Sequence, residues 1–198
     1  MKHLSIITNF EGAHIGVPST TLSSLDKLKA AAEFEKAEGI SVLGGGDPLF
    51  EYENHKKYYQ RLFRVCREMK LPLEVHTTFV ESEFPYEKCA YMVYHLHDFD
   101  QVTHVTRHGN EKVRVVFVVD KSCTLDTIDK VADFCESSDA IDGLCFRLRT
   151  KTHRPQKCCY DYIREGFGKR WTYVEGPVDE SPYFVNGVIY YEFADISL

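Results

Sequence analysis

The chain has 198 residues, 43% of them hydrophobic and 27% charged, which is typical of one folded domain with a sizeable apolar core. Its net charge of −6 disfavours a nonspecific nucleic-acid binder, although it leaves room for a local basic groove. No apolar run reaches the ~18 residues of a membrane helix, no signal-peptide pattern is present, and seven irregularly spaced cysteines favour free thiols, so we expect a cytoplasmic protein.

Strand-like and helix-like segments alternate along the first part of the chain. Short apolar runs predict strands over Leu4–Thr8, Ile40–Leu43 and Leu73–Thr77. Amphipathic periodicity predicts helices over Leu22–Glu38 and Tyr52–Met69. The first helix is expected to be capped by Ser23 or Ser24, to end at Gly39, and to bury Leu22, Leu25, Leu28, Ala32 and Phe34.

The same alternation continues toward the carboxyl end. Strands are predicted over Tyr91–His95, Val113–Val119 and Gly143–Leu148, and the valine-rich run of the second is typical of a buried parallel strand. Helices are predicted over Thr124–Cys135, with Thr124 as the N-cap, and over Cys158–Phe167. The tail has strand-like segments over Arg170–Glu175 and Tyr183–Phe193, and Asn186-Gly187 is a strong hairpin signal.

The order of these segments predicts the fold class. Six strands separated by helices or longer connections favour parallel pairing with right-handed crossovers. We therefore expect an α/β protein, an open (partial) TIM-like barrel of about six parallel strands with a C-terminal β-hairpin. The whole chain, 1–198, is then a single domain, with the barrel over 1–169 and the hairpin extension over 170–198.

A glycine-rich turn follows the second predicted strand, and it is the clearest candidate site. Glycines at the end of a parallel strand allow the backbone to approach a ligand closely, and such strand ends are where α/β proteins bind ligands. In the segment Gly44-Gly45-Gly46-Asp47-Pro48, Asp47 would offer a carboxylate to a cation and Pro48 would stiffen the turn. The alternative is a plain glycine-rich turn; it is not a P-loop, because no Gly-Lys-Ser/Thr follows.

These residues resemble a motif of the radical S-adenosylmethionine (SAM) family. Gly45, Gly46, Asp47 and Pro48 match that family's Gly-Gly-Glu/Asp-Pro motif, and the chain is similar to small members such as activating enzymes and deazaguanine synthases. The resemblance implies that this turn holds the methionine amino group of SAM. It also implies a CxxxCxxC loop after the first strand, whose thiolates bind a [4Fe–4S] cluster.

The chain departs from the family in that loop. Gly12, Gly16 and Ser19 stand at the spacing of the three cysteines, and cluster irons require soft thiolate ligands. We therefore expect no [4Fe–4S] cluster and no radical chemistry from the sequence as written. Because the cluster is the strongest anchor of SAM in the family, any SAM binding should be weak.

Weaker signals lie at the ends of other strands. The family places polar residues facing the ligand where His76 and Thr78 end the third strand. His95 and His97 end the fourth; scattered histidines of this kind indicate a polar barrel mouth, with a metal site as the alternative, and we assign no metal ligands. Arg147 and Arg149 alternate along the sixth strand, and if they point inward they need an anionic partner, either a ligand carboxylate or a structural acid.

Three functions remain open at this point. The first is a pseudoenzyme, a cluster-less relative that binds a small molecule or a partner. The second is an active radical SAM enzyme whose cysteines at 12, 16 and 19 were substituted, and the third is a non-radical enzyme using Asp47, His76, His95 or His97 as acid–base groups. We favour the first, because a mixture of two glycines and a serine looks like sequence drift. The aromatic tail, 171–193, either packs on the barrel or contacts a second subunit in a homodimer; membrane and nucleic-acid partners are not expected.

Overall fold

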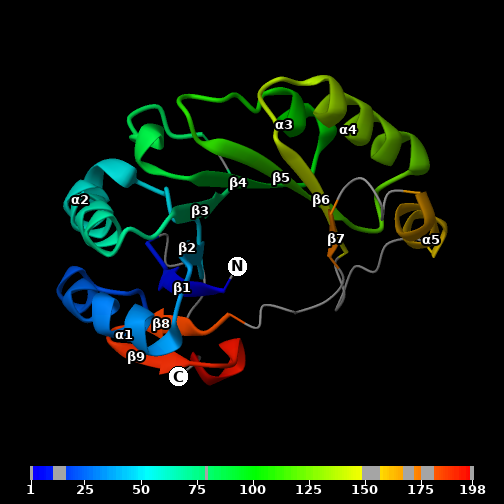
Figure 1. Ribbon diagram of the computed structural model, residues 1–198. Coiled ribbons are helices and arrows are strands. Elements are labelled where there is room, and N and C mark those ends of the chain that lie inside the picture. Colours follow the sequence, from blue (N-terminus) through cyan, green and yellow to red (C-terminus); the bar gives the residue numbers. More distant parts are fainter. Residues whose placement is uncertain are drawn as a thin grey trace. The chain divides into compact units, whose positions relative to one another are not determined.

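Strands and helices alternate through most of the structure, a computed structural model that describes residues 2–10, 17–78, 80–148, 157–166, 172–174 and 181–196 (Figure 1). The fold is α/β with mostly parallel strands, as expected from the order of the segments. The chain divides into two units, Met1–Met92 with Asp179–Leu198, and Val93–Val178. The partial barrel stays a prediction.

The first unit is built on strands β1, β2, β3, β8 and β9, in the order β3-β2-β1-β8-β9. Pairing is parallel from β3 through β8, and only the last pair, β8 with β9, is antiparallel. Ser41 of β2 lies opposite Ser5 on one side and Glu74 on the other. The bounds are β1 His3–Thr8, β2 Gly39–Gly44, β3 Leu73–Thr77, β8 Tyr183–Val185 and β9 Val188–Tyr190.

The two faces of this sheet differ in character. Helices α1 (Leu28–Glu35) and α2 (Tyr52–Met69) lie on one face, where alternate strand residues such as Leu4, Ile6 and Val42 are fully buried (Figure 1). Part of the other face is an apolar cluster formed by Ile7, Tyr183, Val185 and Ile196 together with Val17, Leu43 and Tyr190. The remainder of that second face is polar, and it belongs to the candidate site described below.

The predicted first helix is wrong in its form and in part of its buried side. Residues Leu22–Lys27 form a 3-10 helix, η1, and only Leu28–Glu35 are α-helical. The N-cap is Thr21 rather than a serine, and Ser24 instead donates its hydroxyl to the Thr21 carbonyl at 2.7 Å, which accompanies the tighter i→i+3 turn. Leu22 is 45% and Phe34 73% exposed. Phe34 follows Ala32 by two residues, about 200° around an α-helix, so it lies opposite the buried side of α1.

The second unit carries the end of β4, followed by β5, β6 and β7. Strands β5 and β6 are parallel, as predicted for the valine-rich run. β7 is also parallel to β6, which corrects the expectation that 170–175 joins an antiparallel addition. The bounds are β4 Tyr91–Leu96, α3 Phe99–Thr103, β5 Lys112–Val119, α4 Leu125–Ser137, β6 Gly143–Leu148, α5 Lys157–Gly166 and β7 Thr172–Val174.

In this unit, the helix N-cap that the sequence predicted for α4 is confirmed. Thr124 caps α4, accepting a hydrogen bond from the Thr127 amide at 3.1 Å. The short helix α3 was not predicted; it is held by a capping box between Asp98 and Gln101. Cys135 and Cys145 are buried free thiols, as is Cys66 in the first unit.

The predicted hairpin at the carboxyl end is present. Asn186 and Gly187 both have positive φ, 51° and 87°, as a two-residue hairpin turn between β8 and β9 requires. The structure places β8 in parallel beside β1, so the tail extends the sheet rather than packing on it as a separate ribbon. Two further one-turn helices of this unit are η2, Tyr86–Lys88, and η3, Phe193–Ile196.

The hairpin is tied to α1 by a buried carboxylate. Tyr191 donates its hydroxyl to Glu35 at 2.7 Å, and Lys2 donates to the same carboxylate at 3.0 Å. The hydrogen bond from Tyr191 lowers the pKa of Glu35, because it stabilises the charged form.

Among the described helices, none is both long and apolar enough to cross a membrane.

Candidate functional site

The glycine-rich turn follows β2, and sterics explain two of its glycines. A Cβ on Gly44 would lie 1.4 Å from the Gly46 carbonyl oxygen, so no other residue fits there without a change in the turn. A Cβ on Gly45 would lie 3.0 Å from Val17 Cγ1, and the Gly45 amide donates to the Thr8 carbonyl at 2.8 Å. The turn is therefore pressed against the end of β1 and the segment that follows it.

Asp47 ties this turn to the end of β3. Its Oδ1 accepts hydrogen bonds from the Leu49 amide and the Thr77 hydroxyl, both at 2.8 Å. Its Oδ2 accepts from the Thr78 amide and, at 2.7 Å, from the Thr78 hydroxyl. The carboxylate is 8% exposed, and each oxygen receives one backbone amide and one threonine hydroxyl. The charge of Asp47 is thus used to fix two strand ends relative to each other.

The structure brings together only some of the predicted ligand-facing residues. Gly45, Gly46, Asp47 and Pro48 adjoin Thr78 through the bonds of Asp47, and His76 lies two residues before Thr78 on β3. Pro48 is itself held, because Tyr59 donates its hydroxyl to the Pro48 carbonyl at 2.6 Å.

The two predicted arginines have a different outcome. Arg147 belongs to the second unit and is exposed, so the condition that it points inward and is buried is not met. Arg149 lies outside the described residues.

A row of polar side chains crosses the face of β1, β2 and β3 that is opposite the helices. His3 Nδ1 lies 2.6 Å from Ser41 Oγ, and Ser41 donates to Glu74 Oε1 at 3.2 Å. His76 Nε2 lies 2.7 Å from the same Glu74 oxygen. These four residues, His3, Ser41, Glu74 and His76, are called the polar row below.

The polar row is held in a largely buried setting. Ser41 is 4% and Glu74 8% exposed, and the two imidazoles are half-buried. The His3 ring lies against Gly39, where a Cβ would come within 3.0 Å of His3 Nε2. A carboxylate buried this deeply must be compensated, and the hydroxyl and the imidazole of His76 supply that compensation. The row therefore joins two imidazoles, a hydroxyl and a carboxylate in one hydrogen-bonded series.

Of the four residues in the polar row, the sequence prediction included only His76. The available signal was the period-two spacing of polar residues in otherwise apolar strands: His3 and Ser5 in β1, Ser41 in β2, and Glu74 and His76 in β3. That spacing places them on one face but does not say that the three strands align them in register.

The segment after β1 corresponds to the expected cluster loop. Gly12 and Gly16 lie outside the described residues. Ser19 accepts a hydrogen bond from the Asn9 amide at 3.1 Å, and the Asn9 side chain donates to the Val17 carbonyl at 2.8 Å. The hydroxyl at the third cysteine position therefore serves to hold the end of β1.

The other histidines named as acid–base candidates lie on or after β4. His95 is half-buried on β4, and His97, which follows that strand, is exposed with its amide donating to the Gln101 side chain at 3.0 Å. Both belong to the second unit. Within the ranges that the structure describes, no three His, Cys, Asp or Glu side chains are grouped so that they could hold a metal ion.

An aromatic cluster supports the end of β1. The Phe10 ring stacks on the His55 imidazole with centroids 3.7 Å apart and planes at 10°, and its edge contacts Tyr58 and Tyr59. Burial lowers the pKa of His55, because the charged imidazolium loses hydration in this setting, while Glu51 acts in the opposite direction.

The stability of the protein should therefore fall as His55 is protonated. The unfolded chain binds a proton at His55 near pH 6.5, and the folded protein binds it only at lower pH. The contribution of neutral His55 to the free energy of unfolding is therefore fully present above about pH 6.5 and is lost as the pH falls through the folded pKa. Denaturant unfolding between pH 8 and pH 5 measures this slope. His55→Phe keeps the stacked ring without the titrating nitrogen, and it should flatten the slope; an equal slope in both proteins would show that another group is responsible.

Comparison of the chain with protein-family models, with curated proteins and with solved structures finds no match.

Proposed function

We propose that this chain is a radical-SAM-like protein without cluster ligands, which binds a small polar molecule at the carboxyl ends of β1, β2 and β3. The observation that carries the proposal is the fixed turn Gly44–Pro48, which Asp47 ties to Thr77 and Thr78 at the end of β3, the strand that also carries Glu74 and His76 of the polar row. A glycine turn at a strand end, with hydroxyl, imidazole and carboxylate groups on the neighbouring strand, is the chemistry that a small polar ligand needs.

SAM is the first ligand to test, and its binding should be weak. Losing iron chelation worth even ~3–4 kcal/mol would weaken binding by two to three powers of ten. Both oxygens of Asp47 already accept protein hydrogen bonds, so this carboxylate would add little for the methionine ammonium. We therefore place residual recognition on the polar row, chiefly on His76 and Glu74.

Calorimetric titration with SAM tests this assignment. The unchanged protein should bind SAM weakly, in the high-micromolar range or above, and His76→Gln or Glu74→Gln should weaken it further. Asp139→Asn, at an exposed position of the second unit, is the control and should have no effect. Submicromolar binding that neither row variant alters would overturn the assignment of the row.

Anaerobic reconstitution with iron and sulfide tests the loss of the cluster. The protein should stay colourless, because Gly12, Gly16 and Ser19 supply no thiolates. Restoring cysteine at all three positions together is the converse experiment. A stoichiometric four-iron cluster in the unchanged protein, with absorption near ~400 nm, would contradict the proposal and favour an active radical enzyme.

A second candidate is a non-radical enzyme that uses acid–base chemistry. The observation that favours it is the continuous hydrogen-bonded connection from His3 through Ser41 and Glu74 to His76. Histidine NMR titrations separate the two functions. Coupled titration of the two imidazoles that is abolished by Glu74→Gln supports proton transfer along the row, whereas independent titrations support simple binding.

A further inference from the structure

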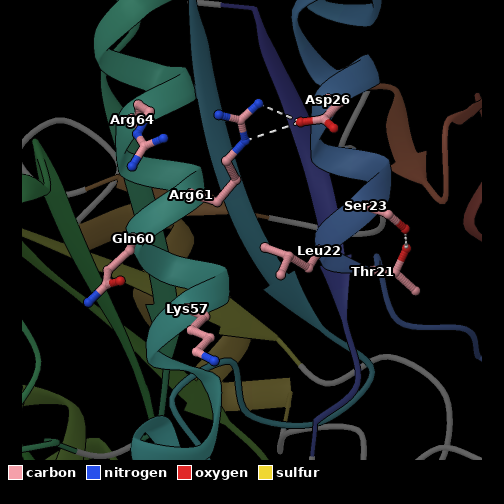
Figure 2. A pocket seen from close by; sticks show the side chains of 8 residues that line it. All are labelled: Thr21, Leu22, Ser23, Asp26, Lys57, Gln60, Arg61 and Arg64. Atoms are coloured by element: carbon pink, nitrogen blue, oxygen red, sulfur yellow. Dashed lines mark hydrogen bonds and ion pairs between the residues drawn. The ribbon is translucent and has the colours of Figure 1, made fainter.

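Two neighbouring hollows flank α2 on the helix side of the first unit, and basic side chains line both. A hollow of about 640 Å³ lies between η1 and α2, and Figure 2 shows Lys57, Arg61 and Arg64 around it. A second hollow of about 660 Å³ shares Gln60 and Arg64 with the first. It lies on the other flank of α2, where it reaches Arg67 and is bordered by the segments 71–73 and 88–90. We call the two hollows together the α2 groove.

The charges of the α2 groove are largely uncompensated. Arg61 is paired with Asp26, to which its Nε donates at 3.1 Å. Figure 2 shows the Arg61 guanidinium directed at Asp26 on η1. Among the described residues, the side chains of Lys57, Arg64 and Arg67 form no ion pair or hydrogen bond. By contrast, Lys56 is paired with Glu53 and Lys130 with Asp126. Three free cations on one groove of a chain with net charge −6 call for an anionic partner.

Apolar side chains are interleaved with these cations. Leu22 is 45% exposed and points into the first hollow between η1 and α2 (Figure 2). Leu71 and Pro72 line the second hollow, together with Phe63, whose ring is covered by the Lys88 ammonium at 5.6 Å from its centroid. The groove therefore offers apolar contact as well as charge, but its aromatic ring is already occupied and does not offer an open face for stacking a base.

The length of the groove fits an extended peptide. Lys57 and Arg67 are separated by about 15 Å along the helix axis, at ~1.5 Å per residue. An extended segment of about five residues covers the same distance, at ~3.3 Å per residue. Acidic side chains on such a segment could reach Lys57, Arg64 and Arg67, while an apolar side chain meets Leu22.

We propose that the α2 groove docks an acidic, leucine-containing segment of a partner protein. The free cations provide charge complementarity, and Leu22, Leu71 and Pro72 provide the apolar contact that a bare polyanion would not use. Asp26, which also lines the first hollow, disfavours closely spaced phosphates. The proposal is independent of the ligand site at the strand ends, because it involves the opposite face of the sheet.

Fluorescence anisotropy with a labelled peptide tests the proposal on the whole chain. The probe is a twelve-residue peptide of aspartate and glutamate with leucine at every third position. Lys57→Glu combined with Arg64→Glu should weaken its binding roughly tenfold or more. Leu22→Ser should weaken it several-fold, because it removes the apolar contact without changing charge.

The control is Lys121→Glu combined with Lys157→Glu, which changes the net charge equally at two exposed positions of the second unit. It should leave binding within about twofold. Equal losses in the groove variant and the control would show diffuse electrostatics and overturn the proposal. So would failure of the peptide to bind, or tighter binding of a labelled oligothymidylate, which would assign the groove to nucleic acid.

Discussion

Replacing Asp47 with asparagine is expected to lower the free energy of unfolding by about 2–3 kcal/mol, in the absence of any ligand. Asparagine keeps the shape but turns one acceptor oxygen into an amino group. The threonine hydroxyls can rotate to accept from that group, but backbone amides cannot. Because the Leu49 amide points at one oxygen and the Thr78 amide at the other, either orientation of asparagine leaves one amide without its acceptor.

Thermal and denaturant unfolding measure this effect. For a chain of this size, the expected loss corresponds to a fall in the melting temperature of about 5–10 °C. Asp139→Asn, at an exposed site, should change the unfolding free energy by less than about 0.5 kcal/mol. Unchanged stability of Asp47→Asn together with lost SAM affinity would show that the carboxylate faces the ligand, as the family resemblance implies.

Replacing Gly44 with alanine should have the largest effect of any single methyl addition that we predict. The new Cβ would lie 1.4 Å from the Gly46 carbonyl oxygen and 2.6 Å from its carbon, so the turn after β2 must open. Opening would separate Asp47 from Thr77 and Thr78 and would break the bond from the Gly45 amide to Thr8. We expect a loss of at least about 3 kcal/mol of unfolding free energy.

Gly143→Ala is the matched control for this variant. Gly143 also lies at a strand end, but the nearest atom to its added Cβ is Arg114 Cγ at 3.8 Å, an ordinary contact. This variant should unfold at nearly the same denaturant concentration as the unchanged protein. Hydrogen exchange of the Gly45 and Thr78 amides gives a local readout, and protection in Gly44→Ala equal to that of the unchanged protein would contradict the prediction.

The two stability variants test how firmly the glycine turn is held in the fold. Both a plain connection and a ligand-binding turn lose the same hydrogen bonds when Asp47 is replaced, so the loss of stability shows that the turn is fixed to β3. Only a ligand titration shows whether the turn also positions backbone for a ligand. Ligand titrations on stable, folded variants of the polar row then report on the site without disturbing this scaffold.

Several features of this protein follow from the sequence alone, because they depend on neighbouring residues. α2 begins and ends where the amphipathic pattern over Tyr52–Met69 predicts. Asn186-Gly187 forms the hairpin turn because these two residues tolerate positive φ, and Thr124 caps α4 because its own hydroxyl reaches the Thr127 amide. The alternation of strands with helices likewise predicted the parallel pairing.

Only the tertiary structure decided the features that join segments far apart in the chain. Two partners of Asp47, Thr77 and Thr78, come from the end of β3, thirty or more residues later. The polar row exists because Ser41 lies in register between Ser5 and Glu74. β8 joins β1 in parallel across more than 170 residues. Residues Leu22–Lys27 wind as a 3-10 helix, which an amphipathic pattern drawn for an α-helix does not reveal. Strand register and helix winding depend on packing against the rest of the fold, and therefore the site could be located from the sequence but its contacts could not.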